Sequence, residues 1–309
     1  MRPAAFDRPG RFWRGNLHTH STRSDGALEV ADVCAAYRRR GYDFLAVTDH
    51  FIGAYGYPVT DTTGLRGDGF TTLIGAELHS GAQENGALWH ILALGLPFDF
   101  APGDCPGFLP HAGQESGAAI AARAAAAGAF VVIAHPEWSG LTEADMAAIG
   151  AAHAVEVYNH GCAVECDRGR GLHAADLLAA RGRRLGFIAT DDAHFRHGVL
   201  DAFGGWTMVK AEENTPEALL SALKAGAMYA STGPDLLDVE IAGGRVAVRC
   251  SPCVAIVLAG EGVVTAVEHG TALTGAELEI GLLESSPWLR VTLIDADGKK
   301  AWSNPIWRS

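Results

Sequence analysis

The sequence of 309 residues predicts an α/β barrel followed by a small antiparallel β-sandwich. Up to about residue 234, short apolar runs alternate with helical patterns, which indicates parallel strands joined by crossover helices. A His, Asp or Glu follows nearly every apolar run. Because only a barrel brings the carboxyl ends of all its strands to one mouth, this recurrence favours a closed or nearly closed barrel.

The predicted elements of the first part follow one another in regular alternation. Runs rich in Val, Ile, Leu, Phe or Ala predict strands over 12–18, 44–48, 71–78, 88–94, 130–134, 154–158, 185–190 and 206–210. Helical patterns between them predict helices over 28–40, 114–127, 143–150, 171–181 and 216–225. The segment 54–69 is rich in Gly, Tyr, Thr and Asp, and we expect it to form a long loop over the site.

The character of the chain changes after Ser231-Thr232-Gly233-Pro234, because no helical pattern follows. Short alternating runs predict strands over 238–242, 245–249, 255–258, 277–283 and 290–294, with hairpin turns at 242–245 and 295–298. About 75 residues suffice for a small sandwich. We therefore expect a barrel domain over 1–234 and a β-sandwich domain over 235–309, which packs against the barrel or shapes one side of its mouth.

Composition narrows the class of protein. A net charge of −12 without a basic stripe disfavours binding of a long nucleic acid. The N-terminus has no apolar core typical of a secretory signal, and no segment is apolar enough to span a bilayer, so we expect a cytoplasmic protein without membrane contact. The six cysteines include two close pairs, Cys162 with Cys166 and Cys250 with Cys253, but the pairs lie far apart in sequence, so we expect reduced thiols and no zinc site. The sequence does not predict an oligomeric state.

Nine side chains stand out as candidate metal ligands, and all offer nitrogen or carboxylate oxygen. They are His18, His20, Asp25, His50, Glu77, His90, His135, Asp192 and His194. Any one of these histidines alone would more often be an ordinary core residue, but their joint recurrence at strand ends favours a metal site. Donors of this kind suit Zn, Mn or Fe. Nine donors exceed the needs of one ion, so we expect two or three divalent ions that share a bridging carboxylate.

The charge of such a site indicates its substrate. Three divalent ions and three carboxylates would leave about +3, which favours phosphate and lowers the pKa of bound water. A small anionic substrate is therefore expected. His79, Asp49 and Asp191 lie beside the chosen ligands in sequence, and we expect them to orient imidazoles.

The motifs around these donors resemble the PHP (polymerase and histidinol phosphatase) superfamily, in the order of that family. They are His18-x-His20 with Asp25-Gly26, Val47-Thr48-Asp49-His50, Gly75-Ala76-Glu77, His90-Ile91-Leu92, His135-Pro136 and Asp192-Ala193-His194. The resemblance covers roughly residues 12–234 and implies a distorted seven-stranded β/α barrel with metals at the carboxyl ends of its strands.

The resemblance also implies a ligand assignment. A first metal would be held by His18, His20, Glu77 and Asp192. A second would share Glu77 and be held by His90 and His135. A third would be held by Asp25, His50 and His194.

Two features refine the resemblance within the superfamily. Histidinol phosphatases usually have His where this chain has Asp25, so the pattern is more similar to general phosphoesterases and nucleotide-directed hydrolases. Other segments resemble carbaryl-hydrolase-like metallohydrolases, which implies carbamates and carboxylic esters as alternative substrates. These segments are 156–159, 191–195, 229–234 and 301–306.

These observations predict a metal-dependent phosphoesterase that hydrolyses a small phosphate ester or a nucleotide-type substrate. A hydroxide that bridges two ions would attack phosphorus in line, while a third ion neutralises the phosphate oxygens. Asp192 and His194 belong to this candidate catalytic set. Arg196 and His197 follow the last motif and could contact the substrate anion or protonate the leaving group. Asn159 and His111 are further candidates.

Two alternatives stay open at this point. The same metals could hydrolyse a carbamate or carboxylic ester, which an aromatic, neutral wall built from Tyr55, Tyr57 and Trp138 would favour. The second alternative is a non-catalytic metal-binding module that regulates a partner, although the full set of nine donors speaks against it. A proofreading role beside a polymerase is not expected, because the sequence contains no polymerase module.

Overall fold

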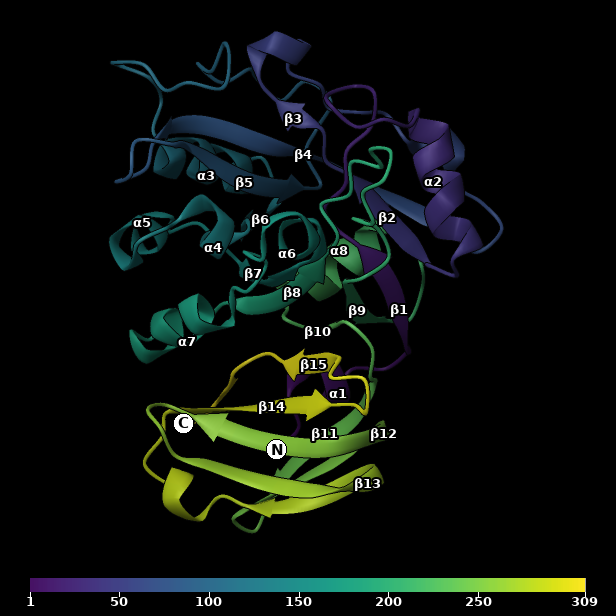
Figure 1. The fold of residues 1–309 in the computed structure, drawn as a ribbon, viewed down its shortest axis with the longest axis vertical. Coiled ribbons are helices and arrows are strands. Elements are labelled where there is room, and N and C mark those ends of the chain that lie inside the picture. Colours follow the sequence, from purple (N-terminus) through teal and green to yellow (C-terminus); the bar gives the residue numbers. More distant parts are fainter. Residues whose placement is uncertain (309) are drawn as a thin grey trace.

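The computed structural model describes residues 1–308. Figure 1 shows helices around the strands in its upper part and long strands in its lower part. The strands are β1 (Arg11–Asn16), β2 (Phe44–Val47), β3 (His50–Phe51), β4 (Thr71–Ala82), β5 (Leu88–Leu94), β6 (Phe130–Ile133), β7 (Ala154–Asn159), β8 (Gly186–Thr190), β9 (Trp206–Ala211), β10 (Met228–Ser231), β11 (Leu236–Ala242), β12 (Arg245–Gly260), β13 (Thr265–Glu279), β14 (Trp288–Ile294), β15 (Lys300–Ser303) and β16 (Ile306–Trp307). The helices are α1 (Ala4–Asp7), α2 (Val30–Arg39), α3 (Gly117–Ala126), α4 (Pro136–Ser139), α5 (Glu143–Ala148), α6 (His160–Cys166), α7 (Leu172–Ala180) and α8 (Pro216–Lys224), with 3-10 turns η1 (Gly53–Tyr55), η2 (Thr63–Leu65) and η3 (Gly281–Leu283).

The helices and strands predicted for the first part are all found, with ends shifted by at most four residues. Helix starts follow from capping side chains: Thr215 accepts a hydrogen bond from the Ala218 amide, and Pro216 occupies the first turn of α8. The elements that the sequence did not predict there are short: α1, β3, α4, α6 and β10. Two 3-10 turns lie in the segment that was expected to be a long loop.

Within residues 1–308 the strands form one hydrogen-bonded sheet, in the order β11-β12-β14-β15-β10-β9-β1-β2-β4-β5-β6-β7-β8. Strands β13, β16 and β3 pair with β12, β14 and β4. The expected barrel and sandwich are therefore not two separate sheets, because β10 pairs with β9 on one side and with β15 on the other. The last strand of the path also approaches β9, where the Thr207 hydroxyl donates to the Ala189 carbonyl of β8.

The expectation of parallel strands throughout the first part was wrong at two places. Pairs β1–β2, β2–β4, β6–β7 and β7–β8 are parallel. Strand β5 is antiparallel to β4 and β6, and β9 is antiparallel to β1. The physical reason is clear for β5, since the connection 83–87 is too short to hold a crossover helix and instead closes a hairpin.

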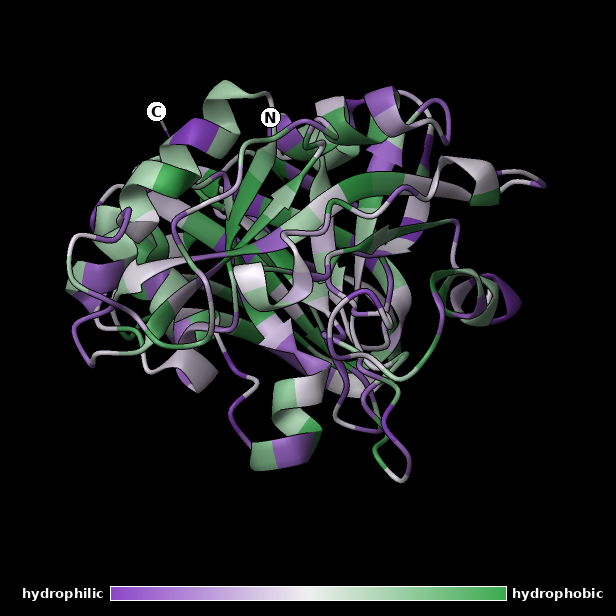
Figure 2. Ribbon diagram, turned by 90° about the horizontal axis from the view of Figure 1, so that it is seen from above, coloured by the Kyte–Doolittle hydropathy of each residue, from purple (hydrophilic) through white to green (hydrophobic). Residues whose placement is uncertain are grey.

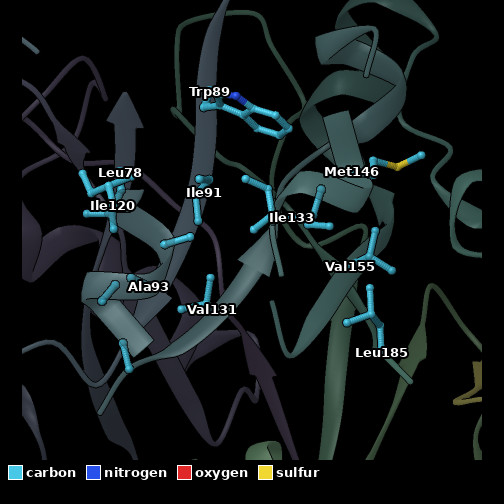
Figure 3. Close-up of a cluster of buried hydrophobic side chains, with 14 of the residues drawn as sticks. Leu78, Trp89, Ile91, Ala93, Ile120, Val131, Ile133, Met146, Val155 and Leu185 are labelled. Carbon is cyan, nitrogen blue, oxygen red and sulfur yellow. The ribbon is translucent and has the colours of Figure 1, made fainter. Parts of the chain in front are cut away.

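Apolar side chains cover both faces of the strands in the first part. On β4 and β5, Leu78, Trp89 and Ile91 point to a core under α3, which Figure 3 shows together with Ile133 and Val155. The opposite face presents a second apolar cluster, formed by residues such as Leu73, Leu92, Leu94, Phe130, Ile188 and Val209. Figure 2 shows the same arrangement, with green strands inside and purple segments concentrated at the surface. Alternate strand residues can therefore place polar groups at one end of this second cluster.

The C-terminal part is built from longer strands than predicted. The runs 245–249 and 255–258 belong to the single strand β12, in which the pairing register shifts between Arg249 and Cys253. Pro252 lies in this stretch, and a residue without an amide hydrogen favours such an irregularity. The run 277–283 is strand only to Glu279, after which η3 begins. No helix of residues 1–308 is both long and apolar enough to cross a membrane.

Candidate metal centre

The nine predicted donors gather at one place in the structure, and we call them the donor cluster. Ligand atoms of His20, Asp25, His50 and His194 lie within 4.8 Å of one another. The same limit holds for His18, Glu77 and His135, and for His18, His20 and Asp192. His90 joins through its Nδ1, which lies 2.8 Å from Glu77 Oε1. All predicted metal ligands are thus brought together.

His18 and His20 lie just after β1 and not within it, because this strand ends at Asn16. The backbone nevertheless stays extended between two neighbours. The His20 amide donates to the Ala193 carbonyl at 2.9 Å, and the Thr48 amide donates to the Thr19 carbonyl at 2.8 Å. Alternate residues of an extended segment share a face, so the two imidazoles point the same way, with ring centroids 5.3 Å apart.

Glu77 and His90 lie inside strands, which corrects the expectation that the donors follow strand ends. Glu77 is central in β4, which continues to Ala82, and His90 is the third residue of β5. Because β5 runs antiparallel to β4, its beginning lies at the same edge as the carboxyl ends of the parallel strands, and His90 pairs with His79. The neighbouring residues in the strands point to the apolar core, so the alternation separates donors from core.

Two donors occupy a backbone conformation that is unusual for residues other than glycine. His135 has φ of 23° and precedes α4, and Asp192 has φ of 55° just after β8. Such conformations cost free energy and persist only where surrounding contacts impose them. Here the His135 amide donates to Glu156 Oε2 at 2.6 Å, and the Asp192 amide donates to the His18 carbonyl at 2.9 Å. The strain falls on two donors, which fits a functional site.

Glu77 lies at the centre of the cluster and is almost completely buried. Its Oε2 lies 3.7 Å from His79 Nε2, and its two oxygens are also close to five imidazoles of the donor cluster. The distances are 2.6 Å to His50 Nδ1, 2.8 Å to His90 Nδ1, 3.2 Å to His135 Nε2, 3.6 Å to His18 Nε2 and 3.6 Å to His20 Nε2. A carboxylate in this position can face more than one ion.

The ionisable groups of the donor cluster shift one another's pKa values. Burial would raise the pKa of Glu77, but His50, His90 and His18 hold it well below its ordinary value. Burial together with His79 lowers the pKa of His90 to about 3. His18 differs: burial disfavours its charged form, yet Asp192, Glu156 and Glu77 raise its pKa well above the ordinary value. The carboxylate of Glu77 is thus held in its ionised form, which a metal ligand requires.

The residues fit a divalent metal on two structural observations. Thirteen buried side-chain nitrogen or oxygen atoms of residues 1–308 have no hydrogen-bond partner, and three of them are His18 Nε2, Asp25 Oδ1 and Glu77 Oε2. Buried polar atoms nearly always have one, and these three all belong to the donor cluster. The donor set itself contains imidazole nitrogen and carboxylate oxygen without thiolate, which suits Zn, Mn or Fe.

Sequence reasoning did not assign a role to Glu156, which lies in the middle of the buried strand β7. His18 Nδ1 donates to its Oε1 at 2.8 Å, which leaves His18 Nε2 free for a metal. The Thr190 hydroxyl, the His135 amide and the Asn159 amide group also donate to this carboxylate. A carboxylate within an apolar strand run was the signal that could have found it.

The predicted orienting groups have different partners from those expected. Asp49 accepts hydrogen bonds from Ser21, Ser24 and Thr60, so it holds loops and not an imidazole. Asp191 likewise accepts from Tyr37 and from three amides of residues 203–205. Of the three groups, His79 alone contacts an imidazole, with 2.8 Å between its Nε2 and His50 Nδ1.

Imidazoles are oriented by other acceptors. The Asp192 carbonyl accepts from His194 Nδ1 at 2.9 Å, and Ser139 Oγ lies 2.9 Å from His135 Nδ1. Asn159 was a further sequence candidate, and it is buried and donates to Asp192 Oδ2 at 3.1 Å. These contacts keep the second nitrogen of each ring directed at the cluster.

A cavity of about 670 Å³ opens onto the donor cluster. Arg196 lines it, and its Nη2 lies 2.6 Å from Asp25 Oδ2. Arg168 lines it as well, which the sequence did not indicate. His197 is exposed and is not among the lining residues, and His111 is exposed and lies 3.3 Å from Asp104.

Aromatic side chains also line this cavity. Of the three rings predicted for a neutral wall, only Trp138 lines the cavity. The Tyr55 ring lies beside His50, with 6.4 Å between the ring centroids. The Tyr57 hydroxyl accepts a hydrogen bond from the Cys105 amide. Phe108, which the sequence did not single out, is a second lining ring. The cavity therefore combines guanidinium groups with an aromatic surface.

The comparisons with known proteins bear on the fold. No protein-family model matches the chain. A segment of 37 residues, 12% of the chain, is 46% identical to DNA polymerase/3'-5' exonuclease PolX of Bacillus subtilis (strain 168), and it spans 6% of that protein. An amidohydrolase from Chromobacterium violaceum, solved with bound sulfate and no metal, is similar over 60% of this chain and 89% of that one, with 19% identity and a TM-score of 0.43.

A further structure is similar over nearly the whole length. It is a two-domain protein from Bacteroides vulgatus ATCC 8482 that contains a predicted PHP-like metal-dependent phosphoesterase. The similarity covers 99% of both chains, with 15% identity and a TM-score of 0.52. The carbaryl-hydrolase subgroup stays a prediction. At the level of the fold the resemblance of the motifs is confirmed: this chain is a mixed α/β protein whose fold is similar to that of a two-domain protein containing a predicted PHP-like metal-dependent phosphoesterase.

Proposed function

We propose that the protein is a metal-dependent phosphoesterase that hydrolyses a small phosphate ester or nucleotide-type substrate at a site of two or three divalent ions. The observation that supports this most is Glu77, a buried carboxylate that faces five imidazoles at the floor of an open cavity. A bridging carboxylate of this kind is expected where several ions share one site.

The donor groups suggest how the ions would be held. His18, His20, Glu77 and Asp192 would hold one ion, Glu77 with His90 and His135 a second, and Asp25 with His50 and His194 a third. Bound divalent ions supply Lewis acidity and lower the pKa of water enough for hydrolysis at neutral pH. Zn, Mn and Fe all suit this donor set.

The remaining roles belong to side chains at the rim. In hydrolysis of a phosphate ester, a bond forms between water oxygen and phosphorus, and the bond to the ester oxygen breaks. The guanidinium groups of Arg168 and Arg196 line the cavity and would bind phosphate oxygens. Arg196 lines the cavity and His197 does not, so Arg196 is the stronger candidate of the two.

We also propose the finer division of the fold, into a distorted seven-stranded barrel over 1–234 and a β-sandwich domain over 235–309. The apolar cluster with Leu92 and Ile188 supports a barrel interior, because β8, at one end of the sheet path, and β9 and β10, near its middle, all contribute to it. A separate apolar cluster formed mainly by β11, β12 and β14 supports the second domain.

Hydrolysis of a carbamate or carboxylic ester by the same metals is the second candidate. The aromatic rings of Trp138 and Phe108 at the cavity favour it, because a neutral, flat wall binds uncharged esters. The two guanidinium groups favour phosphate, since an ester of no charge would gain little from them.

The test is elemental analysis of bound metal, combined with turnover of matched aryl phosphate, aryl phosphodiester and aryl carboxylate ester substrates on the same preparation. We expect two or three ions per chain and turnover of a phosphate ester. Turnover of the carboxylate ester alone would replace the phosphoesterase by the second candidate. A preparation without metal that cannot be loaded with Zn, Mn or Fe would overturn both.

A further inference from the structure

The cavity over the donor cluster has an aromatic side that the donors do not explain. Trp138 follows His135 on α4, and Phe108 comes from the unrelated coil between β5 and α3. Both rings line the cavity. They are 43% and 48% exposed, which is high for side chains of this size. We call them the aromatic pair.

Each ring of the aromatic pair contacts donor imidazoles and still leaves surface free. Trp138 meets His135 at 4.8 Å and His90 at 5.2 Å between ring centroids, both edge to face. Phe108 meets His50 at 5.6 Å, also edge to face. The two rings therefore stand beside different imidazoles of the same cluster, and apolar Leu88 and Leu109 line the cavity with them.

Exposed aromatic surface next to a polar floor is unfavourable unless something covers it. Large exposed apolar groups that share one concave surface mark binding sites. Flat rings are covered best by another ring, because stacked and edge-to-face pairs add about 0.5–1.5 kcal/mol to the effect of burial. A substrate without a ring or other apolar part, such as glycerol phosphate, would leave these rings uncovered.

We propose that the aromatic pair binds the alcohol part of the substrate, and that this alcohol carries an aromatic ring. The substrate class is thus a phosphate monoester of an aryl or arylalkyl alcohol, with its phosphoryl group at the donor cluster and its ring against Trp138 and Phe108. This inference rests on the proposed function, because the phosphoryl group fixes where the ring lies. A cavity of about 670 Å³ has the size typical for such a ligand.

The experiment compares two phosphonates that cannot be hydrolysed at the ester position, phenylphosphonate and methylphosphonate, by isothermal titration calorimetry on the metal-loaded protein. Both have the same anionic head, so the ratio of their dissociation constants isolates the ring. We expect phenylphosphonate to bind about tenfold more tightly or better, as burial of a ring implies. Equal dissociation constants would overturn the ring subsite.

Substitutions in the aromatic pair test whether these two rings cause the preference for phenylphosphonate. Trp138→Leu keeps an apolar side chain without the ring, and Phe108→Ala lies on a coil that supplies no donor, so its folding and metal content should be unchanged. Each is expected to reduce the ratio about two- to tenfold. Phe98→Ala is the matched control, because Phe98 is an exposed ring in the same coil that does not line the cavity. A ratio unchanged in both variants would contradict the proposal.

Turnover separates this inference from the function on which it rests. Hydrolysis of phenyl phosphate without a ring preference in binding would keep the phosphoesterase and overturn the ring subsite. A ring preference that depends on Trp138 and Phe108, without turnover of any phosphate ester, would support the subsite and overturn the phosphoesterase.

Discussion

The two halves of the donor cluster are held in different ways. The inner donors are His18, His20, Glu77, His90, His135 and Asp192, and the outer donors are Asp25, His50 and His194. Among the inner donors, the carboxylate of Glu156 fixes the His18 ring and the His135 backbone inside the strands. Among the outer donors, Asp25 is 25% exposed and its fixed partner is the exposed guanidinium of Arg196.

The difference concerns how firmly each half is organised. Charge-assisted hydrogen bonds buried in a low dielectric hold a geometry strongly. An ion pair at the surface is weakened by water and salt and contributes little. The inner donors are therefore a rigid frame, whereas the outer donors are adjustable and lie where the substrate enters. Four experiments test this difference between the inner and outer donors.

The largest effect is expected for Glu77→Gln, because this residue is the contact between the halves. We expect kcat/KM to fall on the order of a thousandfold or more, since ion-derived stabilisation of the transition state amounts to several kcal/mol. Metal content should fall in parallel. Glu165→Gln is the control, because Glu165 lines the same cavity without contact to a donor. Full metal content with full turnover would refute the central role of Glu77.

Graded chelation should remove the ions in stages. The inner donors include two buried carboxylates and the outer donors one partly exposed carboxylate, so the outer ion should leave first. Metal content followed against chelator concentration should show at least two steps, with activity lost in the first. Loss of all ions in a single step would show that the halves bind metal as one unit.

Glu156→Gln tests the inner frame without removing a donor. Loss of a carboxylate that orients a metal-binding histidine typically weakens metal affinity ten- to hundredfold, and we expect about that for the inner ion. Competition with a chromophoric chelator measures it. Glu143→Gln, at a half-buried residue that pairs with Arg181 away from the donors, should leave the affinity unchanged. An equal loss at the outer ion would contradict the separation of the halves.

The smallest effect is expected for Arg196→Ala. Removal of one exposed ion pair should weaken the outer ion about two- to fivefold at low salt and less at high salt. Arg196→Lys should restore part of the affinity, since it keeps the charge but not the planar fork. The measurement is affinity for the outer ion at two ionic strengths. An effect of tenfold or more that is independent of salt would mean that Arg196 acts on the inner frame.

The sequence predicted the donors better than the way in which they are held. All nine residues that gather in the donor cluster could be selected from the sequence, because His, Asp and Glu next to apolar runs are conspicuous. Glu156 escaped notice since it interrupts a buried strand and has no sequence neighbour among the donors. Phe108 and Arg168 escaped because they come from coil segments, where periodicity gives no orientation.

The fold prediction located the strands but not how they pair. Apolar runs located the strands, but the sense of β5 depends on the length of the connection before it, and the continuity of the sheet depends on the short strand β10. Asp49 and Asp191 were assigned to imidazoles by sequence proximity, although their side chains point to serine, threonine and tyrosine hydroxyls and to backbone amides. Neighbours along the chain are poor guides to hydrogen-bond partners.

The hairpin between β4 and β5 links two properties that are usually independent. Its pairing register decides whether Glu77 and His90 face the donors or the apolar core, because a shift by one residue turns every side chain of a strand to the other face. Its turn, 83–87, also lines the cavity. The number of residues in this turn therefore affects both the direction in which Glu77 and His90 point and the shape of the cavity. Natural variation in selectivity should then come from substitutions within the turn and not from insertions.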